Sequence, residues 1–276
     1  MTLLVVAGVA GMLIGLSLGA LGGGGSILAV PVLVYLLGQS PAQATTGSLV
    51  VVGVTSLIGA VTAYRAGNVM LGRGVAFGLV AIGGAVVGAH ASAHVPEPVL
   101  LAAFAVLMLV VGTVMAVRQI RGRRADTAAN RAPSLRVDDP IITFTPTFAC
   151  QCPRALKVLV TATAVGLLTG FLGVGGGFLV VPALLLALAL PMEYAVGTSL
   201  VVITITSAVA LAVRAGSGIQ PDWGLVLLLT LASATGGFLG ARLALRTDTR
   251  RLSGAFTVLV LTVAGYTSIR AFPGLV

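Results

Sequence analysis

Long apolar runs follow one another along the chain, separated by short polar connections. Runs near 20 residues are long enough to cross the hydrocarbon core of a bilayer as helices, since each residue adds about 1.5 Å. Two runs are shorter, and each lies between a glycine cluster and a proline. The pattern predicts an all-α polytopic membrane protein with about eight to ten transmembrane or half-membrane helices. The predicted runs are 3–21, 26–38, 42–63, 74–91, 97–117, 157–172, 177–190, 194–213, 223–245 and 252–272.

The composition excludes a water-soluble globular protein. Of the 276 residues, 58% are hydrophobic and 8% are charged, whereas a soluble domain has about 25% charged residues. The net charge of +9 does not indicate nucleic acid, because the cations form no basic face with interleaved aromatic residues. Half of them lie in one polar stretch between apolar runs, the pattern of a cytoplasmic loop. We therefore expect the lipid bilayer as a partner and no nucleic acid.

The two halves of the chain repeat each other in sequence. The motif GLSLGALGGGGSILAVP at Gly15–Pro31 returns as GLLTGFLGVGGGFLVVP at Gly166–Pro182, an offset of 151. Matched glycine, proline, serine and arginine positions argue against a chance similarity between two apolar stretches, so we predict two structural repeats. Further matches join Ala44–Ser56 to Ala195–Ser207, Tyr64–Val69 to Val213–Gly218, and Gly84 and Gly88 to Gly236 and Gly240.

Charge placement predicts that the two repeats are inverted in a cell (inner or plasma) membrane. Five helices per repeat make an odd number of crossings, which turns the second repeat upside down. Basic loops belong inside, so the polar linker is cytoplasmic and both termini lie outside. The alternative is that the short runs re-enter without crossing, which would change the side of both termini. Arg65 is the first Lys or Arg, so the start lacks the basic region of a cleavable signal peptide. The predicted domains are a first transmembrane repeat at 1–117, the cytoplasmic linker at 118–156 and a second transmembrane repeat at 157–276.

The glycine clusters before the two short runs are candidate breaks in membrane helices. Non-helical backbone at membrane depth persists only where protein or a cavity surrounds it. A short helix after such a break has free amide groups at its N-terminus, and these attract anions. The alternative is that the glycines only permit tight helix packing. The predicted substrate-binding glycines are Gly22, Gly23, Gly24, Gly25, Gly173, Gly175, Gly176 and Gly177.

Hydroxyl side chains follow both short runs at matched positions. A hydroxyl donates to an anion without bringing a buried formal charge into the membrane. The alternative is a hydrogen bond to the helix's own backbone, which is common for membrane Ser and Thr. The predicted substrate-binding hydroxyls are Thr45, Thr46, Ser48, Thr198 and Ser199, with Thr55, Ser56, Thr206 and Ser207 as weaker candidates.

Three charged residues at the ends of apolar runs leave alternatives open. Arg65 and Arg214 occupy equivalent ends, and we favour interfacial anchors that extend to the headgroups over groups that attract an anion. Glu193 lies at the start of its run, where a surface position is favoured over a proton relay.

The remaining reactive residues predict neither a metal site nor an enzyme. The i, i+4, i+7 spacing of His90, His94 and Glu97 suggests one helical face, but three ligands from one helix end make a poor closed site. Cys150 and Cys152 lack a second cysteine pair for zinc. No phosphate-binding loop or catalytic motif occurs, so we expect no cofactor and transport that is downhill or driven by a gradient.

Several of these stretches resemble the TauE/SafE family of membrane proteins, often called sulfite exporters. The resemblance is carried by GFLGVGGGFLVVPAL (Gly170–Leu184) and AVGTSL (Ala195–Leu200), and less faithfully by GALGGGGSILAVPVL and ATTGSL in the first half. Ser26 stands where the second copy has Gly177. The resemblance implies an integral membrane transporter with two repeated halves. It also implies sulfur-containing anions such as sulfite, sulfoacetate or related organosulfonates as the substrate class.

The sequence thus predicts a secondary transporter of a small anion, preferably sulfite or an organosulfonate, that works by alternating access between two repeated halves. Two alternatives stay open. One is a transporter of another solute, such as a metal ion or a neutral metabolite. The other is a membrane partner that delivers sulfur through Cys150 and Cys152. A homo-oligomer also stays open, as do the coupling ion and the direction of transport.

Overall fold

The computed structural model describes residues 2–92, 94–126, 152–172, 177–188, 190–215, 221–244, 247 and 249–271. Within these ranges the backbone forms only helices and short connections, so the predicted all-helical class is confirmed. Each predicted apolar run coincides with a helix. The helices are α1 (Thr2–Leu21), α2 (Gly24–Pro31), the π-helical η1 (Val32–Leu36), α3 (Pro41–Arg65), α4 (Leu71–Ser92), α5 (Glu97–Asp126), α6 (Cys152–Leu172), α7 (Gly177–Ala187), α8 (Met192–Arg214), α9 (Trp223–Ala244) and α10 (Thr249–Ala271).

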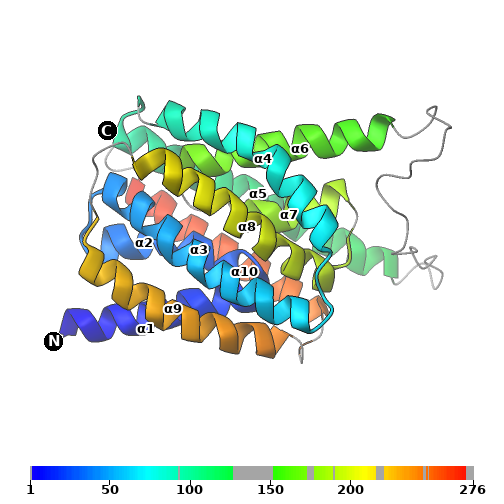
Figure 1. The fold of residues 1–276 in the computed structure, drawn as a ribbon. Helices are drawn as coiled ribbons and strands as arrows, with labels where there is room; N and C mark the ends of the chain where they lie inside the picture. Colours follow the sequence, from blue (N-terminus) through cyan, green and yellow to red (C-terminus); the bar gives the residue numbers. More distant parts are fainter. Residues whose placement is uncertain are drawn as a thin grey trace.

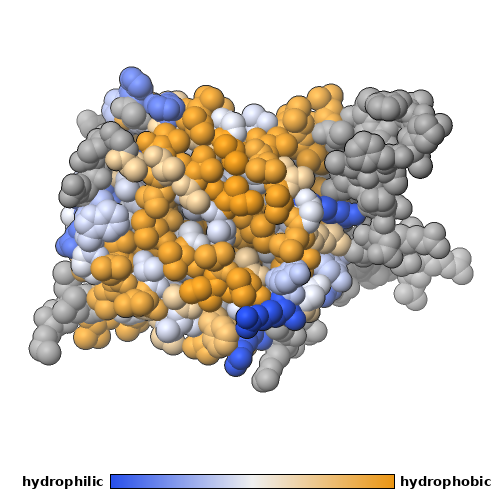
Figure 2. Space-filling model, viewed as in Figure 1, coloured by the Kyte–Doolittle hydropathy of each residue, from blue (hydrophilic) through white to orange (hydrophobic). Residues whose placement is uncertain are grey.

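The surface suits a lipid environment. Among the described residues, α3, α4, α8 and α9 are long and apolar enough to cross a membrane, and several other helices contain shorter apolar stretches. Large aliphatic side chains such as Val5, Leu79 and Leu231 are exposed. Figure 2 shows a broad apolar surface with the strongly hydrophilic residues toward its edges. Exposing so large an apolar surface to water would be unfavourable, whereas contact with lipid hydrocarbon is favourable.

Each half of the chain starts at one end of the helix bundle and finishes at the opposite end (Figure 1). In Figure 1, the start of α1 and the end of α10 lie at the left, while the end of α5 and the start of α6 lie at the right. This placement agrees with an odd number of passes in each half. The ends of α5 and α6 extend into the range predicted as the linker, and residues 127–151 lie outside the described ranges. The domain division and the side of the membrane that each end faces stay predictions.

The contacts between helices recur when the two halves are exchanged. Under the sequence repeat, α1 to α5 correspond to α6 to α10. Helix α1 packs on α9, and its equivalent α6 packs on α4. In the same way α3 packs on α9, and α8 packs on α4, while α3 with α8, α5 with α10 and α2 with α7 pair across the halves. The repeat in sequence is therefore also a repeat in packing, although the insertion of one half upside down in a membrane stays a prediction.

Glycines bring the α1–α9 and α4–α6 pairs into backbone contact. A Cβ atom on Gly15 of α1 would overlap the carbonyl oxygen of Ser233 of α9, and one on Gly166 of α6 would overlap that of Ala81 of α4. Small residues let membrane helices approach closely enough for dense packing. This requirement explains why these positions match between the halves. The other glycines in such backbone contacts are Gly19, Gly84, Gly88, Gly170, Gly236 and Gly240.

Replacing Gly15 with alanine is expected to destabilise the protein by about 1–3 kcal/mol, because the new methyl group must push two helix backbones apart. The measurement is the thermal unfolding midpoint in detergent. Gly8 is the matched control, because it lies on the same helix and a Cβ there would meet nothing within 4 Å. Equal midpoints for Gly15→Ala and Gly8→Ala would contradict the packing argument.

Candidate functional site

The first glycine cluster breaks the helix, as the sequence predicts. Gly22 has a φ of +70°, a conformation that side chains with a Cβ rarely adopt. Helix α2 then begins at Gly24, with Gly23 before it. The first amide groups of a helix have no partner within that helix. The Ser26 hydroxyl donates to the Gly23 carbonyl oxygen at 2.7 Å. The break itself is therefore observed, while anion binding at it stays a prediction.

The starts of the two short helices are buried and lie against each other. Helix α7 begins at Gly177, and a Cβ there would lie 2.7 Å from the Ser26 hydroxyl and 3.0 Å from Gly23 Cα. Ser26 and Gly177 are matched by the repeat, so equivalent positions of the two halves touch each other. A Cβ at this position would require the Ser26 hydroxyl to shift. The other glycines of the second cluster, Gly173, Gly175 and Gly176, lie outside the described residues.

Ser199 of the second half holds the break in the first half. Its hydroxyl lies 2.5 Å from the Gly22 carbonyl oxygen and 2.7 Å from that of Val196. A hydroxyl has one proton, so it donates to one of these oxygens at a time. A Cβ on Gly22 would lie 2.6 Å from Val196 Cα and 2.8 Å from Ser199 Oγ. Ser199 is therefore a predicted hydroxyl that contacts the first glycine cluster directly.

The other predicted hydroxyls bond to backbone groups. Thr45 and Thr46 both donate to the Ala42 carbonyl oxygen, at 2.9 and 3.0 Å, and Ser48 donates to that of Thr45 at 2.8 Å. Thr198 Oγ1 accepts a hydrogen bond from the Met70 amide at 3.1 Å, which ties the connection before α4 to α8. Donation to the same helix is the ordinary alternative for a membrane hydroxyl. A role in substrate binding for these four residues stays a prediction.

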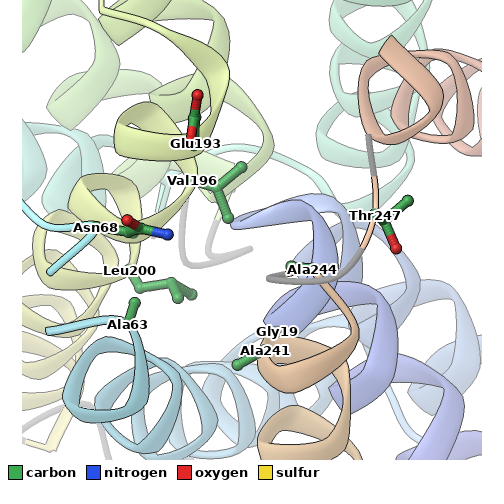
Figure 3. Close-up of a pocket in the computed structure, with 10 residues that line it drawn as sticks. Gly19, Ala63, Asn68, Glu193, Val196, Leu200, Ala241, Ala244 and Thr247 are labelled. Carbon is green, nitrogen blue, oxygen red and sulfur yellow. The ribbon is translucent and has the colours of Figure 1, made fainter. Parts of the chain in front are cut away.

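A cavity of about 90 Å³ lies near the break, although no described residue of the glycine clusters lines it. Val196 belongs to both, since it lines the cavity and packs against Gly22. Asn68 and Leu200 lie on one side of the cavity, and Ala244 and Thr247 lie on the other (Figure 3). Pockets for drug-sized ligands have volumes of about 300–1,000 Å³, so this one suits a small solute. The lining residues are Gly19, Ala63, Asn68, Glu193, Val196, Gly197, Leu200, Ala241, Ala244 and Thr247.

Asn68 is a polar lining residue that the sequence analysis missed. Its side chain belongs to the connection between α3 and α4, and its amide nitrogen carries two hydrogen-bond donors. The signal in the sequence was the repeated RAG motif just before it, which marks a matched connection in both halves. Glu193 also lines the cavity and is exposed, which agrees with the favoured surface position. The cavity therefore presents both a neutral donor and one carboxylate.

Arg214 differs from the favoured interpretation as an interfacial anchor. Its guanidinium reaches across to the first half, where one nitrogen donates to Thr45 Oγ1 at 3.1 Å and the other donates to Ser92 Oγ at 3.0 Å. Its side chain is only partly exposed, whereas the equivalent Arg65 is exposed. The repeat therefore places the two arginines at equivalent helix ends, but in this structure they have different surroundings.

Two weaker sequence candidates are uncommitted hydrogen-bond donors. Ser56 of α3 and Ser207 of α8 are buried, and within the described ranges neither hydroxyl has a hydrogen-bond partner. The repeat matches these two serines, and α3 packs on α8. Ser207 lies against Gly53 of α3, because a Cβ atom on Gly53 would be 3.3 Å from Ser207 Cβ. Helices α3 and α8 thus contain two buried hydroxyls without a partner in the described part of the chain.

The residues that a metal transporter would use do not converge in the described part of the chain. His90 and His94 are exposed, and His94 Nδ1 lies 3.1 Å from the His90 carbonyl oxygen. No group of three or more His, Cys, Asp and Glu that could hold a metal ion occurs among the described residues. Cys150 and the side chains of Glu97 and Cys152 lie outside the described residues, so the cysteine alternative stays untested.

Comparisons with known proteins match the chain to one family of membrane proteins and to membrane transporters of two bacteria. Residues 7–267 match the family described as "Sulfite exporter TauE/SafE". The chain is 32% identical over 269 residues to a probable membrane transporter protein of Xylella fastidiosa strain 9a5c, covering 96% of this chain and 95% of the relative. It is 26% identical over 266 residues to the probable membrane transporter protein YunE of Bacillus subtilis, covering 94% and 92%. No solved structure matches the chain significantly.

Proposed function

The chain belongs to the TauE/SafE family of membrane transporters, and from this premise we propose that it carries a small sulfur-containing anion such as sulfite or an organosulfonate. The observation that carries the proposal is the break at Gly22 and Gly23, which Ser199 holds beside a small cavity. The description of the family as sulfite exporters supports a sulfur-containing solute, and the break in the backbone supports binding through the oxygens of that solute.

The donors around the break suit an oxyanion better than a cation. A helix N-terminus carries about half a positive charge together with free amide groups. Asn68 adds neutral donors at the cavity. Sulfite and sulfonate groups each present three oxygens that accept hydrogen bonds, so several donors can bind one solute. Glu193 sets a limit on affinity, because a carboxylate at the cavity repels an anion unless it is protonated or lies at a distance.

Transport by alternating access is the mechanism that we propose for this site. The two halves use matched surfaces to pack on each other, so the equivalent contacts can form at either end of the molecule. The open cavity lies beside the start of α8. At the other end of α8, Arg214 is bonded to the first half. A cavity at one end and a bonded contact at the other is the arrangement of a transporter that is open to one side.

Flux of radiolabelled sulfite into proteoliposomes tests the substrate assignment. We expect uptake that saturates with sulfite concentration and exceeds that of protein-free liposomes. An excess of an organosulfonate is expected to compete, whereas a neutral sugar or a divalent metal ion is not. Protein that is folded by thermal unfolding in the same lipid, yet moves no sulfur oxyanion, would reject the assignment. Uptake of a metal ion that depends on His90 and His94 would favour the metal alternative instead.

A further inference from the structure

The start of α8 lines the cavity, and Arg214 lies at the other end of this helix. There its guanidinium makes hydrogen bonds to Thr45 and Ser92. We propose that Arg214 is a latch that holds this far end of the transporter closed while the cavity end is open. The inference rests on the proposed alternating access, but it does not depend on which solute is carried. It makes Arg214 a positioning residue of the transport cycle rather than a lipid-facing anchor.

The contacts between helices define two bodies that can move against each other. Helices α1, α3 and α9 pack on one another, and we call them the first trio; α4, α6 and α8 also pack on one another and form the second trio. Each trio combines helices from both sequence halves. The glycine contacts of α1 with α9 and of α4 with α6 are backbone contacts, which hold these two pairs of helices close together. The main packing between the trios is that of α3 on α8.

The cavity lies between these two bodies. The first trio contributes Gly19, Ala63, Ala241 and Ala244 to its lining, whereas α8 of the second trio contributes four further residues. These are Glu193, Val196, Gly197 and Leu200. A movement of one trio against the other would therefore widen or close this space.

The repeat identifies the counterpart of the cavity at the other end of the molecule. Val196 corresponds to Thr45 at the offset of 151, and Ala244 corresponds to Ser92 at the offset that joins Gly84 to Gly236. Arg214 donates to both Thr45 and Ser92, at 3.1 and 3.0 Å. The guanidinium therefore binds the counterparts of two cavity-lining residues. At that end, the hydrogen bond to Thr45 joins the second trio to the first, while the bond to Ser92 within the second trio orients the guanidinium.

The repeat does not reproduce the two hydroxyl acceptors of the latch at the cavity end of the molecule. Arg65 is the counterpart of Arg214, but the residues that it would meet are Val196 and Ala244, which have no hydroxyl group. Arg65 is exposed. A guanidinium stays charged and donates in a fixed, planar geometry, and hydrogen bonds to charged groups are stronger than neutral ones. The latch therefore favours the state that is closed at the Arg214 end. An oxyanion arriving there would offer the guanidinium stronger acceptors than hydroxyls do and would release it.

A cysteine reporter of the closed end tests the latch without any substrate. Ala89 is 5% exposed and corresponds to the cavity residue Ala241, so Ala89→Cys reports when this end opens. The protein, with Cys150 and Cys152 replaced by serine, is placed in lipid nanodiscs, where a charged maleimide reaches both ends. The buffer contains chloride and no sulfur oxyanion. The measured quantity is the rate of labelling.

We expect Arg214→Gln and Thr45→Val to raise the labelling rate about ten-fold, the effect of losing one charge-assisted hydrogen bond from the closed state alone. Thr45→Ser keeps the hydroxyl and is expected to keep the slow rate. The matched controls are Arg65→Gln at the equivalent helix end and Thr62→Val, since Thr62 donates within its own helix to Ile58. Both are expected to leave the rate unchanged.

An unchanged rate in folded Arg214→Gln and in Thr45→Val would overturn the latch, as would an equal increase in Arg65→Gln. If Arg214→Gln does not fold, the comparison of Thr45→Val with Thr45→Ser decides the matter with the guanidinium in place. Faster labelling without sulfite flux in the parent protein would reject the substrate and keep the latch. Sulfite flux with unchanged labelling would reject the latch and keep the substrate.

Discussion

Replacing Gly22 with alanine is expected to abolish transport and to lower the stability of the fold. Two separate costs arise at this position. Its φ is +70°, and a residue with a Cβ in this conformation destabilises the fold by about 1–2 kcal/mol. The Cβ itself would lie 2.6 Å from Val196 Cα and 2.7 Å from the Val196 carbonyl oxygen, and overpacking of this kind costs about 1–3 kcal/mol. Because these neighbours are backbone atoms, relief requires α8 to move away from the break.

Gly38 separates the two costs and serves as the matched control. It also has a positive φ, of +65°, but a Cβ there would meet nothing within 4 Å. Gly38→Ala is therefore expected to lose stability through backbone strain alone and to keep sulfite flux near that of the parent protein. Flux and thermal unfolding midpoints are measured for both variants in the same lipid. If Gly22→Ala transports as well as Gly38→Ala, the contact between the break and α8 has no part in transport.

The sequence predicted the helices well because the bilayer restricts the possibilities. A chain that is apolar over nearly its whole length must satisfy its backbone groups internally, and helices do this within one segment. The position of each helix then follows from the apolar runs, and the breaks follow from glycine. The predicted break at Gly22 and Gly23 is observed. The apolar run at 26–38 coincides with α2 and η1.

Contacts between distant side chains could not be read from the sequence. Arg214 bonds to residues that lie 169 and 122 positions away along the chain, and such contacts depend on how α3 and α4 pack against α8. The repeat suggested that Arg65 and Arg214 would behave alike, yet the two surroundings differ in this structure. Asn68 was missed for the same reason, because only the packed connection between α3 and α4 brings it to the cavity.

The hydroxyl residues show a similar limit. A serine or threonine in a membrane helix has two ways to satisfy its proton, either within its own helix or across to a neighbour. The sequence cannot distinguish them. Thr46 uses the first way, and Ser199 has a partner of each kind. Ser56 and Ser207, which ranked lower, are the matched pair without a partner in the described part of the chain.

Replacing Ala244 with phenylalanine is expected to reduce sulfite flux at least about ten-fold, the effect of a barrier raised by about 1.4 kcal/mol. Ala244 lines the cavity from the end of α9 and is only partly buried, so a larger side chain can enter the space without displacing a packed backbone. A cavity of about 90 Å³ has little room left for a solute once an aromatic ring occupies it. Initial rates of sulfite uptake measure the effect.

Ala164 provides the comparison, since it is exposed on α6 and Ala164→Phe adds the same ring outside the cavity. This variant is expected to transport at the parental rate. The pair separates two explanations of the cavity, because a packing gap between helices should tolerate filling and a solute path should not. Full flux in Ala244→Phe would mean that the solute does not pass between the first and second trios at this end. The latch at Arg214 would then have no solute path to close. Uptake by Ala244→Phe and labelling of Ala89→Cys therefore test the movement of the first trio against the second at opposite ends of the molecule.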